Sequence, residues 1–343
     1  MYPERKNLYE ALGEKRNSRV VAYITGDRPG LELGVRPEVV DFFVDHLDQC
    51  GPCPKISLYL YTRGGATLTA WSIVSLIRQY CEDFEVIVPS KCLSAGTMMA
   101  IGADRIIMTK QATLGPIDPG INTPLNPRVE GGSRLPVSVE AIRGYLELAK
   151  EELGIQGEEN LTKILMGLSE KIHPLVLGEY RRARMQITML AKRLLSRQIS
   201  DPEQVGEVIR FLSSDSGSHD YTISLREAKE ELGLKVEEPD GELYALIKAL
   251  YEDIRAELLL NEAHDPGRYL GTKARAPYSF KRSLLESLEG GSHFFLSEGE
   301  YTRVPVPGGM QESLGDDRIF EGWRHIEAEV SGPRSLFAGL KRS

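Results

Sequence analysis

The first 120 residues of this 343-residue chain alternate short apolar runs with segments of helical period, and this alternation constrains the fold more than any other feature. Runs rich in β-branched and aromatic residues predict strands, and apolar residues spaced by three or four predict helices. We expect strands at 19–24, 56–61, 84–89 and 104–108, and helices at 37–50, 66–81 and 95–102. Alternating strands and helices are typical of a layered α/β domain with a mainly parallel sheet.

The pattern becomes helical after the Pro/Gly-rich loop LGPIDPGINTPLNPRVEGGSRLP. Helices are predicted near 138–152, 160–169, 174–198 and 241–261, and one more begins near Ser224, which forms a capping box with Glu227. From residue 262, Gly, Pro and charged residues dilute the pattern, so we expect a loosely structured, irregular extension with a few short strands. The predicted organisation is an α/β domain over 1–240 and a helix with a loose C-terminal extension over 241–343.

Charge and hydropathy exclude several classes of protein. Fifty acidic and 42 basic residues give a net charge of −8, which argues against a general affinity for nucleic acid or anionic membrane. The N-terminal stretch MYPERKNLYEALGEKRNSRV is charged throughout and lacks the apolar core of a signal peptide. No run reaches the roughly 18 apolar residues of a membrane span. We therefore expect a cytoplasmic protein without an integral membrane segment.

The four cysteines do not predict a disulfide framework or a metal site. Cys50-Gly51-Pro52-Cys53 has the spacing of a thioredoxin redox motif, but it follows a helical pattern and precedes a strand, which reverses the order of that motif. Gly51 and Pro52 therefore indicate a helix stop and a turn. Cys81 and Cys92 form no second close pair of the kind that binds zinc.

Ser94 lies where a predicted strand turns into a helix, in the segment SKCLSAGTMMAIGADRIIM. A serine at a helix start is usually an N-cap. The same turn would also expose a nucleophile at the edge of a sheet, with free N–H groups of the following helix directed at its side chain. The α/β-hydrolase motif G-x-S-x-G is not matched, because Cys92 replaces its first glycine.

A second turn has the composition that an oxyanion-binding loop needs. In LYLYTRGGATLTAW a strand ends at Thr62 and Gly64 and Gly65 open the next helix. Glycines can turn their peptide N–H groups outward where a side chain would obstruct them. Glycine pairs also open helices in many α/β proteins, so either turn alone leaves a structural role open.

Four elements in this order resemble the serine dehydrogenase proteinase family, a branch of the Clp-peptidase and crotonase superfamily that is related to signal peptide peptidase A. They are T-x-G-G at 62–65, S-A-G-T at 94–97, L-G-P-I-D-P at 114–119 and HDYTISLREAKEELGL at 219–234. The resemblance covers about residues 10–240. It implies a Clp/crotonase-like core, Ser94 as the nucleophile and an oxyanion hole at the backbone of Gly65 and Ala95.

The general base is where the chain departs from the Clp pattern. Clp peptidases carry a histidine about two dozen residues after the serine, whereas this chain has LGPIDPG there. His219, Lys91 and Asp118 remain as candidates. We favour His219, because it precedes Asp220 near the position of the Clp acid and because imidazole titrates near neutrality. Lys91 would form a serine/lysine dyad like that of signal peptide peptidases, but its amine would need burial.

The resemblance implies an ATP-independent serine peptidase that cleaves peptides or proteins, with no metal or organic cofactor. Two other functions stay open. A crotonase-like acyl-CoA enzyme would use the same two-loop oxyanion hole without a nucleophile, and a catalytically silent member would serve as an assembly scaffold. Relatives in the superfamily form rings or stacked oligomers, so a homo-oligomer is expected. Its surface would use apolar positions of 174–198, namely Leu175, Leu177, Ile187, Leu190 and Leu194.

Overall fold

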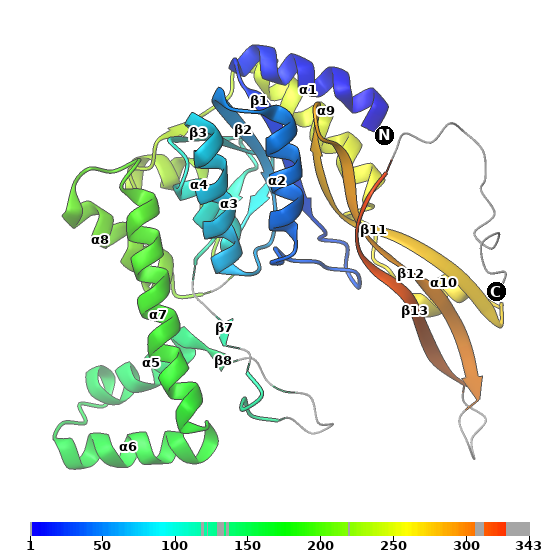
Figure 1. Cartoon of the computed structure of the whole chain (residues 1–343). Helices are drawn as coiled ribbons and strands as arrows, with labels where there is room; N and C mark the ends of the chain where they lie inside the picture. Colours follow the sequence, from blue (N-terminus) through cyan, green and yellow to red (C-terminus); the bar gives the residue numbers. More distant parts are fainter. Residues whose placement is uncertain are drawn as a thin grey trace.

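A computed structural model describes residues 2–117, 120–121, 123–128, 134, 137–218, 220–305 and 312–326, and an eight-stranded sheet forms its centre (Figure 1). Five strands are parallel to one another and three join one edge antiparallel. The order across the sheet is β10 (Val236–Glu237), β5 (Arg105–Met108), β3 (Cys81–Val88), β2 (Cys53–Tyr61), β1 (Arg19–Thr25), β11 (Arg275–Ser287), β12 (Gly291–Pro305) and β13 (Glu312–His325). The predicted layered α/β core is confirmed, and the strands expected at 56–61 and 84–89 are neighbours.

Successive residues of the parallel strands face two different helical layers. In β1, Val21 and Tyr23 belong to one buried cluster, whereas Ala22 and Ile24 belong to another. The first cluster lies under α2 (Val39–Cys50), α3 (Thr67–Tyr80), α4 (Ala95–Ile101) and α7 (Pro174–Leu195). The second lies under α1 (Tyr2–Arg16) and α9 (Gly241–Glu257). Because both faces are covered, these strands are apolar throughout rather than alternating.

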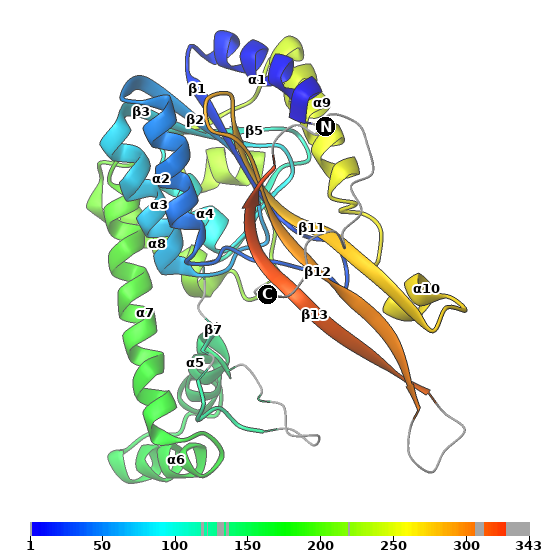
Figure 2. The same cartoon turned by 45° about the vertical axis from the view of Figure 1, so that its right-hand side comes forward.

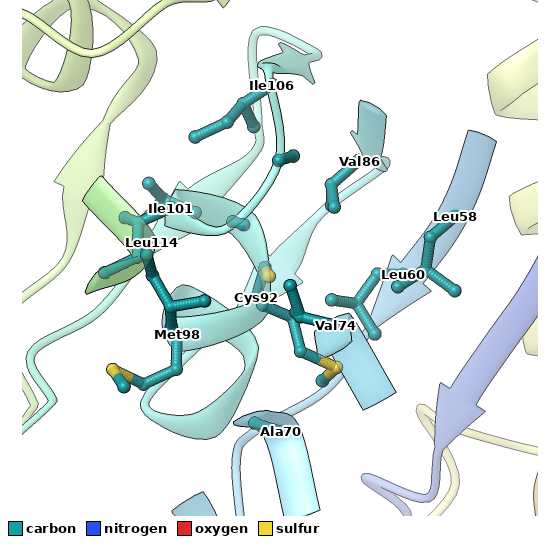
Figure 3. Packing of buried hydrophobic residues seen from close by; sticks show 14 of the residues in the cluster. Leu58, Leu60, Ala70, Val74, Val86, Cys92, Met98, Ile101, Ile106 and Leu114 are labelled. Carbon is teal, nitrogen blue, oxygen red and sulfur yellow. The ribbon is translucent and has the colours of Figure 1, made fainter. Parts of the chain in front are cut away.

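The core below α3 and α4 fixes the position of the turn before α4. Figure 3 shows side chains of β2, β3 and β5 packed against those of the two helices. All seven residues of α4 are buried. A short helix without an exposed face cannot shift without opening this core, so the residue that precedes it is held rigidly.

The remaining described elements are shorter. Two small sheets comprise β4 (Lys91–Cys92), β6 (Thr113–Leu114) and β9 (Ile223–Ser224), and β7 (Gly120–Ile121) with β8 (Val137–Ser138). Helices α5 (Val139–Glu147), α6 (Glu158–Lys171), α8 (Pro202–Arg210) and α10 (Pro266–Leu270) and the π-helical turns η1 (Leu148–Glu152), η2 (Phe211–Asp215) and η3 (Glu227–Glu231) complete the set. Helices α5 and α6 and the start of α7 project away from the sheet (Figures 1 and 2). In the part of the chain that the structure describes, no helix is long and apolar enough to cross a membrane.

The expectation of a loose C-terminal extension is wrong for residues 275–305 and 312–325. Strands β11, β12 and β13 have 13, 15 and 14 residues and extend the central sheet as a long curved ribbon (Figure 2). In β11, Ala276, Tyr278 and Phe280 are buried, while the residues between them are exposed. The polar residues that dilute the apolar pattern are thus the solvent face of a period-two strand.

Helix α1 is a second element that the sequence did not predict, because a charged residue lies on its buried side. Arg5 is fully buried and donates two hydrogen bonds to the buried Glu286 of β11, of 2.9 and 2.6 Å. The hydroxyl of Tyr9 donates a third, of 2.6 Å, to the same carboxylate. An ion pair therefore anchors α1 to the sheet where an apolar contact would be expected.

Three histidines meet where α2 contacts β12 and β13. The Nε2 atom of His46 lies 2.9 Å from Nδ1 of His293, and its Nδ1 lies 2.8 Å from the hydroxyl of Ser287. The ring of His325 lies 4.7 Å from that of His293, centre to centre. Burial, together with positive charge on His293 and His325, lowers the pKa of His46 to about 3.

These histidines predict a loss of stability in mild acid. An unfolded histidine has a pKa of about 6.5, so below that pH the histidine of the unfolded chain is protonated while native His46 stays neutral. The contribution of His46 to the free energy of unfolding is therefore fully present above about pH 6.5 and is lost as the pH falls below it. From pH 7 to pH 5 the free energy of unfolding should fall by about 2 kcal/mol through His46 alone. Urea unfolding at both values would show a smaller fall in His46→Gln. An equal fall in both proteins would contradict this origin.

Candidate active site

Ser94 has a backbone conformation that serine rarely adopts. Its φ is 52° and its ψ is −111°, in a region of positive φ that costs an L-residue free energy. Ser94 occupies the N-cap position of α4, but its side chain makes no capping hydrogen bond. A purely structural role of Ser94 as a helix cap is therefore not supported. Strain of this kind is found mainly at functional sites.

The Gly64–Gly65 turn packs directly against Ser94. A Cβ atom on Gly64 would lie 2.6 Å from Cβ of Ser94 and 3.1 Å from its Oγ. A Cβ atom on Gly65 would lie 2.3 Å from the backbone N of Val35. The two glycines have φ of 112° and 140°, which side chains disfavour. Both glycines are therefore required, and the two turns noted in the sequence meet at one point.

Thr62 fixes the two turns relative to each other. Its N–H donates to the carbonyl of Lys91, and the N–H of Leu93 donates to the carbonyl of Thr62, both at 2.9 Å. Its hydroxyl oxygen accepts the N–H of Gly64 at 3.0 Å. The strand that ends before the glycines is thus hydrogen-bonded to the strand that ends before Ser94. Their register does not depend on side-chain packing alone.

Two backbone N–H groups beside Ser94 are available as donors. Among the hydrogen bonds of the described residues, none is donated by the N–H of Gly65 or of Ala95. The neighbouring amides are occupied, since that of Gly64 is bound by Thr62 and that of Gly96 donates to the carbonyl of Leu93 at 2.8 Å. An oxyanion hole needs preorganised donors of this kind.

A small sheet brings three of the sequence elements together. Strand β4, two residues before Ser94, pairs with β6, which leads into the LGPI segment, and β6 pairs with β9 of the YTIS segment. The hydroxyl of Thr97 also donates to the carbonyl of Gly115 at 2.7 Å. His219 and Asp118 themselves lie outside the described residues. The segment that follows His219 nevertheless pairs with β6, the neighbour of the strand that precedes Ser94.

Lys91 forms an ion pair with Asp27, a residue that sequence reasoning missed. The Nζ atom of Lys91 lies 2.5 Å from Oδ2 of Asp27, and the lysine side chain is 46% exposed. The carboxylate also accepts the hydroxyl of Tyr61 at 2.8 Å and a guanidinium N–H of Arg63 at 3.3 Å. Asp27 lies two residues after the end of β1, and a polar residue at the carboxyl end of a central strand was the signal available.

The helix stop that the sequence predicted between Cys50 and Cys53 is confirmed, since Gly51 ends α2 with φ of 64° and an N–H that donates to the carbonyl of Leu47 at 2.8 Å. All four cysteines are free. Burial raises the pKa of Cys50 to about 12. A thiol that is protonated at neutral pH is a poor redox nucleophile, so a thioredoxin-like role is not supported.

Comparison with known proteins identifies the segment that holds both turns. Residues 45–129 match the ClpP-like SDH-type serine proteinase family. The matched segment includes the glycine turn and Ser94, and it confirms the resemblance drawn from the sequence motifs. The name of the family describes its members as serine proteinases.

Two relatives of this chain are uncharacterized proteins of Methanocaldococcus jannaschii. One is 28% identical over 258 residues, which is 73% of this chain and 80% of the relative. The other is 29% identical over 181 residues, which is 53% of this chain and 51% of the relative.

Similar solved structures come from at least two proteins. One is the 1510-N membrane-bound stomatin-specific protease, a mutant of which was solved with a substrate peptide. It has 16% identity and a TM-score of 0.35, and the match covers 59% of this chain and 70% of that one. The other is a mutant of ClpP1 from Listeria monocytogenes, with 15% identity, a TM-score of 0.33 and coverage of 68% and 99%.

Proposed function

We propose that the chain is an ATP-independent serine peptidase in which Ser94 is the nucleophile. The observation that carries this proposal is the contact of Ser94, strained and uncapped, with the Gly64–Gly65 turn. The match to a serine proteinase family over the same residues supports it.

The chemistry follows from the positions of the two turns. The Ser94 hydroxyl attacks the carbonyl carbon of a peptide bond while a base removes its proton. The N–H groups of Gly65 and Ala95 stabilise the oxyanion of the tetrahedral intermediate. The base then returns the proton to the leaving amine, and water hydrolyses the resulting ester of Ser94. No step requires a metal ion or a nucleotide.

Incubation with an unfolded protein such as β-casein tests the activity. The purified chain should release peptides without ATP and in the presence of EDTA, and mass spectrometry should identify the cleavage sites. Turnover of acyl-CoA thioesters without peptide release would instead favour the crotonase-like alternative. Absence of both activities in a stable oligomer would favour a scaffold.

We propose His219 as the general base. The segment after His219 pairs with β6, close to Ser94 in the small sheet, and this supports the assignment. The ion pair of Lys91 with Asp27 argues against the lysine, because a base must be unprotonated.

If His219 is the base, activity should rise with pH through an inflection near 6 to 7, roughly the range of a histidine. His219→Ala should lose most of the rate. A near-normal rate in His219→Ala, with Lys91→Ala inactive, would assign the base to Lys91.

We also propose a homo-oligomer, formed through α6 and the first half of α7 rather than the whole predicted surface. Of the five expected positions, Ile187, Leu190 and Leu194 are buried in the chain's own core. Leu175 remains 64% exposed, and α6 has no buried residue, with Leu165 and Met166 more than half exposed. Light scattering at micromolar concentration should give a mass above the 38.2 kDa of one chain. A monomeric mass would contradict assembly.

A further inference from the structure

Two half-exposed cations flank the contact between Ser94 and the glycine turn. Arg63 directly precedes Gly64 and is 56% exposed, and Lys91 lies three residues before Ser94 and is 46% exposed. Both form ion pairs with Asp27, whose side chain is only 7% exposed. The backbone hydrogen bond from Thr62 to Lys91 holds the two cationic segments side by side.

The Asp27 carboxylate does not neutralise both cations. It carries one negative charge against two positive charges, and it also accepts a hydrogen bond from Tyr61. A guanidinium has five N–H donors. One nitrogen of Arg63, Nη1, donates to Oδ1 of Asp27 at 3.3 Å. The cluster keeps an excess of positive charge, although the whole chain has a net charge of −8.

An excess cation next to a nucleophile favours anionic substrates. Arginine donates two parallel hydrogen bonds to a carboxylate, and lysine adds a compact positive charge. Partial burial of the cluster strengthens such contacts relative to the open surface. Both side chains are also about half exposed, so a ligand can reach them.

We propose that Arg63 and Lys91 bind a carboxylate of the peptide substrate, and Asp27 holds the two cations in place. The inference rests on the proposed peptidase function and names its substrate class. The carboxylate belongs either to an Asp or Glu side chain near the cleaved bond or to the C-terminus of the peptide. In both cases the same two cations make the contact.

Matched fluorogenic peptides test the proposal and separate the two sources. One pair differs only by Glu or Gln near the cleaved bond, and a second pair only by a free or amidated C-terminus. We expect kcat/KM to be about tenfold or more higher for the carboxylate member of one pair, mainly through KM. Arg63→Gln should remove that preference, and Arg63→Glu should shift it toward a peptide with Lys in place of Glu. Arg275→Gln, an exposed arginine of β11 that also forms one ion pair, is the matched control and should keep it.

Binding separates failure of this inference from failure of the proposed function. Fluorescence anisotropy with Ser94→Ala should show tighter binding of the carboxylate peptides, weakened by adding Arg63→Gln. Equal rates and equal binding for both members of each pair would overturn the inference and leave the peptidase intact. Preferential binding without cleavage by the wild type would overturn the peptidase instead.

Discussion

The Ser94→Ala variant is expected to lose at least about a thousandfold in kcat/KM for peptide hydrolysis while keeping the stability of the wild type. Without a nucleophile, only substrate binding and the oxyanion donors remain, and in serine peptidases these leave a small fraction of the rate. An N-cap serine would behave differently, because its removal costs about 1 kcal/mol. Ser94 makes no capping hydrogen bond, so the free energy of unfolding should stay within about 0.5 kcal/mol of wild type.

Peptide hydrolysis and urea unfolding, measured side by side, distinguish the two roles of Ser94. Ser72→Ala is the matched control, because Ser72 is an exposed serine of α3, the helix that the glycine turn opens. It should match the wild type in rate. A Ser94→Ala variant that is destabilised yet active would assign Ser94 to the helix cap and would remove it from the chemistry.

The Gly64→Ala variant is expected to lose about a hundredfold in activity. The new methyl group would lie 2.6 Å from Cβ of Ser94, so one of the two turns must move. Displacement of a reacting group by about 1 Å costs on the order of a hundredfold in rate. The same shift would move the amide of Gly65, which is proposed to bind the oxyanion.

Gly51→Ala is the control for backbone strain. Gly51 also has positive φ, but a Cβ atom there would have no heavy atom within 4 Å. Alanine at Gly51 should cost roughly 1–2 kcal/mol of stability and no activity. If Gly64→Ala and Gly51→Ala lose stability equally and both keep full activity, the contact of Gly64 with Ser94 has no role in catalysis.

Much of the core was predictable because its strands are buried on both faces. A strand such as β2 is apolar along most of its length, and this signal does not depend on knowing its neighbours. The two turns were also visible, because glycine pairs and a serine between a strand and a helix are local features. Their contact is a long-range property, and only the family resemblance suggested it.

The missed features depend on contacts between residues far apart in the sequence. Arg5 and Glu286 are 281 positions apart, and each alone looks like a solvated charge. Asp27 lies in a loop without a motif, and its importance follows from the side chains that other segments bring to it. The first half of β11 alternates buried and exposed residues, and its polar outward residues gave the sequence the composition of loose structure.

The measurement that tests the central claim most directly is covalent labelling with a fluorophosphonate probe, followed by mass spectrometry of the digested protein. Such probes form a stable adduct only with a serine whose hydroxyl is activated and whose oxyanion site is formed. We predict one adduct per chain, on the peptide that contains Ser94, and none in Ser94→Ala. Labelling of Ser94→Ala as strong as that of the wild type, or an adduct on a different serine, would contradict the assignment of Ser94 as the nucleophile.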